Sequence, residues 1–332
     1  MKAAAYRRFG PAAEVLEIID RPAAAPGPGE VSVRVRASGV NPSDVKLRAG
    51  ARPGGVAPEM PYPEITPHSD GAGEIDAVGD GVDPSRVGQR VWLWNGQWER
   101  AFGTAAEQIV LPAEQAAPLP DACSFAEGAC LGIPATTAHV GLFADGPIEG
   151  ATVLVSGGAG AVGAYAVEMA KLGGAAQVLT TVSGPEKAAL AKELGADHVI
   201  NYREEDVVEA VMTATAGAGV DRIVEVEFGG NLATNTEIIK PNGAIASYAS
   251  MAVPTPKLPF YQLMFKCVTL RLYVVYRLAP ALRRRAVADL ERWLSEGRLS
   301  HRIAGRWPLA QIADAHAQVE AGAKIGAVIV DV

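Results

Sequence analysis

A glycine-rich segment, GGAGAVG (157–163), has the spacing G-x-x-G-x-x-G. Glycines at this spacing allow a tight turn and let backbone N–H groups approach a diphosphate at the positive end of a helix. The motif alone is weak evidence, but an apolar run (151–156) precedes it and an apolar helical segment (161–172) follows it. A strand, a glycine turn and a helix in this order predict a dinucleotide-binding loop. The residues expected to contact the dinucleotide are Gly157, Gly160, Ala161, Val162 and Gly163.

The end of the next expected strand, 177–182, indicates which nicotinamide cofactor the loop accepts. NAD-binding folds usually carry an acidic residue there, which binds the ribose hydroxyls. Here the strand is followed by Ser183, and Lys187 comes four residues later. Taken alone, Lys187 could be an ordinary lysine on a helix surface, but a hydroxyl and an ammonium group together suit the additional phosphate of NADPH. The pattern therefore predicts NADPH, with Tyr202 beside the adenine or its phosphate.

The segments that must position this loop change in character along the chain. In residues 31–37 apolar and polar side chains alternate, which indicates a half-buried strand in a β-rich region. From about residue 125 onward short apolar strands alternate with helices, which predicts an α/β fold with a doubly wound parallel sheet. The expected strands are 151–156, 177–182, 198–202, 220–227, 244–249, 268–275 and 327–332, and the expected helices are 161–172, 185–194 and 309–320.

Composition argues against several classes of partner. The 332 residues are 49% hydrophobic and 20% charged, with a net charge of −7 and a pI near 5.4. An acidic surface repels nucleic acid and anionic membranes, so neither is expected as a partner. No segment has the apolar core of a signal peptide or the roughly 20 apolar residues of a membrane span, and we expect a cytoplasmic protein.

Two other groups of residues are expected to be structural. The cysteines, Cys123, Cys130 and Cys267, form neither a disulfide framework nor a CxxC pair, so we expect them to be buried small hydrophobes. The arginines of the run 283–285 lie among apolar residues at helical spacing. We expect these arginines to cover a solvated helix face.

Seven segments, in order and over nearly the whole chain, match one family. They are GVNPSD (39–44), TPHSDGAG (66–73), AVGDGV (77–82), LGIPATTAH (131–139), VLVSGGAGAVG (153–163), EKAALAKELGADHVINYR (186–203) and AHAQVEAG (315–322). The sequence resembles the zeta-crystallin-like NADPH:quinone oxidoreductases, a zinc-free branch of the medium-chain dehydrogenase/reductase superfamily. The resemblance implies a GroES-like β-rich catalytic domain, residues 1–124 and 273–332, and a Rossmann NADPH-binding domain at 125–272. It also implies a homodimer that pairs edge strands, for which 268–275 is apolar enough.

The resemblance also bears on zinc. Zinc-dependent relatives carry a cysteine where this chain has Asn41, and a histidine and a glutamate where it has Ser69 and Asp70. His68 lies next to these positions, but it falls on the glycine of the family pattern. Because zinc normally requires thiolate and imidazole ligands, no metal site is expected.

By resemblance, Asn41 and Thr137 lie against the nicotinamide and its ribose. Asn41 could instead be a turn asparagine before proline, and Thr137 a helix-surface or capping hydroxyl. Asp44 is expected either to orient the loop around Asn41 or to cap a helix. Tyr62 and Tyr248 are candidate hydrogen-bond donors to the substrate.

Ser247 and Ser250 follow an expected Rossmann strand at its carboxyl end, where open α/β sheets bind ligands. We therefore expect both serines to contact the cofactor. The remaining histidines have no carboxylate or serine at triad-like positions and are expected to be structural: His139, His198, His301 and His316.

These observations predict a zinc-independent reductase that transfers a hydride from NADPH to a quinone or enone. Donors in a dry cleft could stabilise the charge that develops on the acceptor's carbonyl oxygen. A 2-alkenal, haloacrylate or enoyl-thioester reductase on the same scaffold is an alternative, and so is a non-catalytic NADPH-binding protein. The sequence departs from the family pattern at 51–65, the expected substrate-pocket wall, and at 324–327.

Overall fold

The computed structural model describes residues 1–52, 55–56, 59–322 and 325–332. The chain divides into two compact units, which we call unit 1 (residues 1–133 and 287–332) and unit 2 (residues 134–286). The domain boundaries expected after residues 124 and 272 lie N-terminal to the two junctions, and as boundaries of folding domains they stay a prediction. The short helix α3 (Phe125–Gly128) belongs to unit 1, where it packs on the central strands of the sheet.

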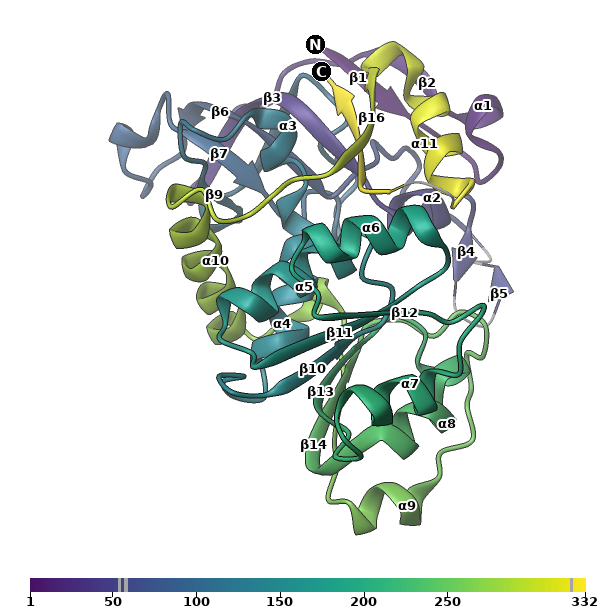
Figure 1. Ribbon diagram of the computed structural model, residues 1–332. Coiled ribbons are helices and arrows are strands. Elements are labelled where there is room, and N and C mark those ends of the chain that lie inside the picture. The colour runs from purple at the N-terminus through teal and green to yellow at the C-terminus, as the bar shows by residue number, and fades with distance from the viewer. Residues whose placement is uncertain (53–54, 57–58, 323–324) are drawn as a thin grey trace. The chain divides into compact units, whose positions relative to one another are not determined.

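Unit 1 is built on a mixed sheet of seven strands (Figure 1). Its order is β16-β17-β3-β6-β7-β9, with β8 also paired to β3, and every pair is antiparallel except β16 with β17. The long strand β3 confirms the strand expected at residues 31–37, but it also buries two of its serines. The strands are β3 (Glu30–Val40), β6 (Asp70–Val78), β7 (Arg90–Leu93), β8 (Gln108–Pro112), β9 (Ala116–Pro118), β16 (Ile303–Pro308) and β17 (Ala327–Asp331).

Smaller elements complete unit 1. Two hairpin-like pairs are formed by β1 (Lys2–Ala5) with β2 (Glu17–Asp20), and by β4 (Ala51–Arg52) with β5 (Gly55–Val56). The helices are α1 (Ala12–Val15), α2 (Pro42–Arg48) and α11 (Ile312–Glu320), with 3₁₀ turns at Pro84–Arg86, Ala113–Gln115 and Leu309–Gln311. Residues 53–54 and 57–58 of the expected pocket wall, and 323–324 of the tail, lie outside the described residues.

Unit 2 contains a six-stranded parallel sheet in the order β12-β11-β10-β13-β14-β15. The strand order reverses between β10 and β13, so the carboxyl ends of these two strands flank the topological switch point. This arrangement confirms the expected doubly wound α/β fold. The strands are β10 (Thr152–Val155), β11 (Gln177–Val182), β12 (His198–Asn201), β13 (Val220–Glu225), β14 (Ile239–Ser247) and β15 (Thr269–Leu272).

Helices cover both faces of this sheet (Figure 1). One face carries α4 (Thr136–Phe143), α5 (Ala161–Leu172) and α6 (Pro185–Glu193), and the other carries α7 (Val207–Ala214) and α8 (Phe228–Ile238). The sequence marked the bounds of α5 correctly, whereas α7 and α8 were not distinguished as helices. The remaining elements are α9 (Phe260–Phe265), α10 (Pro280–Ser295), a π-helical turn at Leu131–Ala135 and a 3₁₀ turn at Val275–Arg277.

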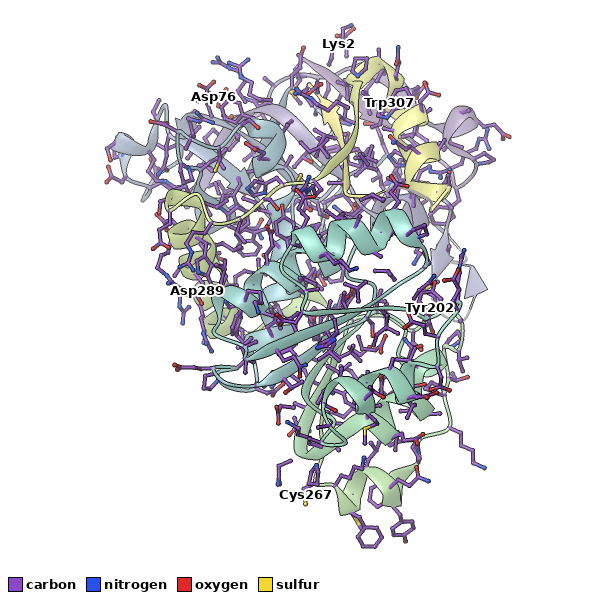
Figure 2. The ribbon with its side chains drawn as sticks, viewed as in Figure 1. Lys2, Asp76, Tyr202, Cys267, Asp289 and Trp307 are labelled. Carbon is purple, nitrogen blue, oxygen red and sulfur yellow. The ribbon has the colours of Figure 1, made fainter. Side chains whose placement is uncertain are left out.

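Two structural expectations are wrong. Arg283 does not face solvent: it is 6% exposed, and its guanidinium donates to the carbonyl of Val275. Cys267 is exposed beside α9 rather than buried (Figure 2). Both errors concern tertiary contacts that helical spacing and residue type do not specify. Among the described residues, no helix has the length and apolarity needed to cross a membrane.

Candidate cofactor and substrate site

The glycine motif forms the turn between β10 and α5. Gly157 has a φ of 75°, in the left-handed region that favours glycine, and its N–H donates to Thr181 Oγ1 at 3.1 Å. A Cβ on Gly163 would lie 2.1 Å from the carbonyl oxygen of Gly157, and one on Gly158 would lie 2.0 Å from Thr180 Oγ1. The turn therefore packs too closely for side chains at these positions.

The N-terminal end of α5 offers unused hydrogen-bond donors. Gly160 occupies the N-cap position and supplies no side-chain cap. Within the described parts of the chain, the N–H groups of Ala161, Val162 and Gly163 donate to no acceptor. Such first-turn amides, together with the helix dipole, suit an anionic ligand such as a diphosphate.

The expected phosphate pair comes together after β11. Ser183 follows this strand directly, and Lys187 Nζ donates to Ser183 Oγ at 3.1 Å. Tyr202 lies next to them in the sheet, because its N–H donates to the carbonyl of Val182 at 3.2 Å. Its side chain is exposed (Figure 2).

A buried carboxylate, Glu225, lies at the carboxyl end of β13 and was not recognised from the sequence. The side chain is fully buried and accepts four hydrogen bonds. One comes from Ser156 Oγ at 2.9 Å, directly before the glycine motif. The other donors are Glu227 N (2.6 Å), at the N-cap of α8, and two side chains within this helix, Asn231 Nδ2 (3.0 Å) and Asn235 Nδ2 (2.7 Å). Glu225 therefore ties the glycine turn to β13 across the switch point.

A second carboxylate, Glu227, holds the loop that follows β14. Its oxygens accept from the backbone N–H groups of residues 251–253 at 2.7, 3.0 and 3.4 Å. These donors lower the pKa of Glu227 although burial raises it. The loop is held further by Ser250, whose hydroxyl accepts from Gly229 N and donates to Val253 O.

Ser247, Tyr248 and Thr137 also lie at positions fixed by neighbouring groups of unit 2. Ser247 Oγ donates to the carbonyl of Ala249 at 3.1 Å. The ring of Tyr248 lies 6.2 Å from that of Tyr273, whose hydroxyl donates to the carbonyl of Thr137 at 2.8 Å. Thr137 is 3% exposed, so it is neither a helix-surface nor an N-cap hydroxyl.

In unit 1, Asn41 is held by two carboxylates. Its Nδ2 donates to Asp70 Oδ2 at 2.8 Å, and its backbone N–H donates to Asp44 Oδ2 at 2.7 Å. Asn41 is the N-cap residue of α2, and Asp44 at N3 completes the capping box, so Asp44 both holds the backbone of Asn41 and helps to cap the helix. Burial, with the charge of Asp70, raises the pKa of Asp44 well above its usual value. Asp70 Oδ2 also accepts from Ile133 N at 2.9 Å, so one carboxylate orients Asn41 and joins it to the turn at 133.

A buried chain of side chains runs from His316 to the backbone of Asp70. His316 Nε2 lies 2.9 Å from His68 Nε2, and His68 Nδ1 lies 2.8 Å from Ser38 Oγ. Ser38 Oγ lies 2.7 Å from Thr104 Oγ1, which donates to the Asp70 carbonyl at 2.6 Å.

Each hydroxyl has one proton, so the directions of these hydrogen bonds follow. Thr104 donates to Asp70, hence Ser38 donates to Thr104 and His68 Nδ1 donates to Ser38. His68 Nε2 must then accept from His316 Nε2. Burial lowers the pKa of His316 to about 3, and burial with the neighbouring imidazole lowers that of His68 well below its usual value. Both histidines are neutral in this arrangement.

Tyr62, the other candidate donor to substrate, is half-buried and packs against the small apolar cluster of Tyr6, Val15 and Ile65. Asn41 and Tyr62 belong to unit 1, whereas Thr137 and the expected cofactor contacts belong to unit 2.

In the described ranges, no group of three or more His, Cys, Asp or Glu side chains is placed to hold a metal ion.

A quinone oxidoreductase of Pseudomonas aeruginosa is 32% identical to this chain over 320 residues, which cover 95% of each protein. The chain belongs to the medium-chain dehydrogenase/reductase family. Within this family it is a quinone oxidoreductase-like oxidoreductase. The family models that match are the alcohol dehydrogenase GroES-like domain, over residues 27–121, and the zinc-binding dehydrogenase, over residues 161–295.

Two solved structures of the family resemble the whole chain. An NAD-dependent alcohol dehydrogenase has a TM-score of 0.87 and 28% identity, with both chains covered completely. The Escherichia coli quinone oxidoreductase complexed with NADPH has a TM-score of 0.85 and 26% identity, again over both full chains. These two proteins are described with different nicotinamide cofactors, so likeness of fold does not by itself choose between them.

Proposed function

We propose that this oxidoreductase binds NADPH and reduces quinones or other conjugated carbonyl compounds without zinc. The observation that carries the proposal is a pair of anion-binding features at the carboxyl edge of one sheet. The open amides of α5 suit a diphosphate, and the Ser183–Lys187 pair suits a separate phosphate. The NADPH bound to the E. coli relative supports the same choice.

Bound NADPH supplies the hydride, and the residues of the chain supply placement and polarity. In unit 2, we assign the diphosphate to the turn at 157–163, the 2′-phosphate to Ser183 and Lys187, and the adenine edge to Tyr202. Ser247 and Ser250 already donate their protons to carbonyls, so toward the cofactor they act as acceptors.

Asn41 and Thr137 are assigned to the nicotinamide and its ribose. The bond from Asn41 Nδ2 to Asp70 fixes the amide, and Asn41 Oδ1 accepts from the backbone N–H of Asp44 in the capping box of α2, which leaves one of its two lone pairs. This oxygen is therefore suited to accept a hydrogen bond from the cofactor. Tyr62 and Tyr248 are the proposed donors to the substrate carbonyl, whose oxygen gains charge as hydride arrives.

The side chains at the positions of the family's zinc ligands support catalysis without a metal. Asn41 replaces a thiolate, and its amide is committed to Asp70. Both ring nitrogens of the neighbouring His68 are engaged, by Ser38 and by His316. This donor set does not fit zinc, which prefers available thiolate and imidazole ligands.

The test is oxidation of NADPH, followed at 340 nm, with a panel of quinones, enones and enals. We expect turnover with at least one class, at a rate that a zinc chelator leaves unchanged. Loss of activity on chelation would contradict the metal-free assignment. Binding of NADPH without oxidation by any acceptor would favour a non-catalytic NADPH-binding protein.

We further propose a homodimer that pairs the exposed edge of the unit 2 sheet. The edge strand β15 ends at Leu272, which is 66% exposed, and Val274 beyond it is 45% exposed. An unpaired apolar edge is a surface that proteins normally cover. Light scattering should give twice the chain mass, and Leu272→Lys should shift it toward the monomer. A monomeric wild-type protein would contradict this proposal.

A further inference from the structure

A turn in unit 1 carries a guanidinium group, that of Arg100, which forms no hydrogen bond with any described residue. Arg100 is half-buried, and its Nη1 is fully buried without a hydrogen-bond partner. Throughout the residues that the structure describes, its side chain makes no hydrogen bond and no ion pair. A buried charged donor is unfavourable without an acceptor, so a purely structural arginine would be expected to have one.

The acidic groups around Arg100 do not neutralise it. Burial lowers the pKa of Arg100, and the Glu30 carboxylate and the Tyr62 hydroxyl oppose this effect. Glu30, however, accepts a hydrogen bond from Gly27 N at 2.9 Å and forms no ion pair with Arg100 in the described structure. No carboxylate of the described residues forms an ion pair with Arg100, so its guanidinium is available to an anion from outside the chain.

The backbone around Arg100 is fixed by its own hydrogen bonds. Gln97 Nε2 donates to the Arg100 carbonyl at 3.1 Å, and Glu99 between them has a φ of 54°. A non-glycine residue in this left-handed region is uncommon and marks a turn whose surroundings hold it in place.

The same turn is attached to the segment that orients Asn41. Gly96 N donates to Ser69 O at 2.8 Å, and Thr104 N donates to His68 O at 3.0 Å. The next residue of this segment, Asp70, holds Asn41 through its carboxylate. Backbone hydrogen bonds thus join the turn that bears Arg100 to the segment that holds Asn41.

We infer that Arg100 binds an acidic group of the substrate, a carboxylate or a phosphate attached to the conjugated acceptor. The inference rests on the proposed function and narrows its substrate class. The planar guanidinium fork matches two anionic oxygens at once. With a net charge of −7, the chain repels anions in general, so recognising one requires a local cation.

Two acceptors that differ only in charge provide the test: 3-benzoylacrylate and its methyl ester, each with NADPH. Arg100→Gln should raise the KM for the acid roughly 10- to 100-fold and leave the KM for the ester unchanged. Arg100→Lys should recover only part of the loss, since it keeps the charge but not the fork. Arg34→Gln, at an exposed arginine of the same unit, is the matched control and should change neither KM.

A second pair of acceptors tests whether Arg100 binds a phosphate or a carboxylate. Crotonyl-coenzyme A carries phosphates, whereas the N-acetylcysteamine thioester of crotonate carries none. A fall in kcat/KM of Arg100→Gln with the coenzyme A ester alone assigns the site to a phosphate. A fall with 3-benzoylacrylate alone assigns it to a carboxylate.

Two results for Arg100→Gln would overturn the inference. One is an equal fall in kcat/KM with charged and neutral acceptors, and the other is no fall with either 3-benzoylacrylate or crotonyl-coenzyme A. Failure of the inference leaves reduction of the neutral ester intact, whereas failure of the proposed function abolishes reduction of every acceptor. Calorimetry with the saturated acid 3-benzoylpropionate measures binding without turnover: wild type should bind this acid and Arg100→Gln should not. The thermal midpoint of Arg100→Gln should equal or exceed that of wild type, and a large decrease would indicate a structural role instead.

Discussion

The two polar regions of this chain differ in how fully the protein uses its own hydrogen-bonding groups. In unit 2, the N–H groups at the start of α5 have no acceptor among the described residues. In unit 1, the chain from His316 through His68 and Ser38 to the Asp70 backbone passes each proton to a neighbour. Open donors at a helix terminus suit a ligand, whereas a connected network holds other residues in position, although His316 Nδ1 at its end has no partner among the described residues.

The largest predicted effect is a loss of folding stability at acidic pH, which arises from the buried histidines of unit 1. His68 and His316 are neutral when folded because burial lowers their pKa values, that of His316 to about 3. Above pH 6.5 both states are neutral and stability does not depend on these groups. Below it, the unfolded chain binds protons that the folded chain refuses. The free energy of unfolding should therefore fall by about 1.4 kcal/mol per pH unit for each histidine.

Urea unfolding between pH 7.5 and 4.5 measures this slope. His316→Gln should reduce this slope by up to about 1.4 kcal/mol per pH unit, because one buried neutral imidazole is removed. His198→Gln, at an exposed histidine, is the control and should leave the slope unchanged. The same slope in wild type and His316→Gln would show that the buried pair is not neutral as described.

A substitution in the glycine turn should lower the affinity for NADPH. A side chain on Gly163 would collide with the Gly157 carbonyl, so Gly163→Val should displace the turn. We expect at least a roughly 100-fold loss of NADPH affinity, about 3 kcal/mol. Gly217→Ala is the control, since its methyl group enters open space at a φ of 82°. It should cost about 1 kcal/mol of stability without changing NADPH affinity.

Glu225 links the two kinds of region. Its carboxylate accepts four hydrogen bonds from the protein, and one of them holds the glycine turn, whose own N–H groups are left for a ligand. Glu225→Gln brings an amide N–H against donors and leaves one of them unpaired, which costs about 1–3 kcal/mol of stability. NADPH affinity should also fall, by roughly tenfold, as Ser156 loses its partner. Glu149→Gln, an exposed carboxylate before the amino end of β10, serves as the control. Unfolding curves and calorimetry on the same samples separate the two effects, and unchanged NADPH affinity would make Glu225 purely structural.

The sequence predicted the elements whose signals are local. The strand, the glycine turn and α5 follow from an apolar run, three spaced glycines and a helical apolar segment, and the bounds of α5 are confirmed. The sequence also placed Ser183 and Lys187 one helical turn apart, and the structure brings them within hydrogen-bond distance.

The contacts that the sequence did not predict join residues far apart in the chain. Glu225 could have been suspected as a carboxylate at the end of an apolar strand, but its partner Ser156 lies 69 residues away. The pair of His68 and His316 spans 248 residues, and helical spacing alone did not reveal the burial of Arg283. Tertiary packing decides these contacts, which a local pattern does not contain.

The most direct test of the central claim is calorimetric titration of wild type and Lys187→Ala with NADPH and with NADH. Because Lys187 and Ser183 are assigned to the 2′-phosphate, wild type should prefer NADPH, and Lys187→Ala should lose 10- to 100-fold of that preference, roughly 1.5–3 kcal/mol. Lys192→Ala, at an exposed lysine of the same helix, should keep it. An unchanged ratio of the two affinities would contradict the phosphate assignment, and binding of neither nucleotide would contradict the whole account.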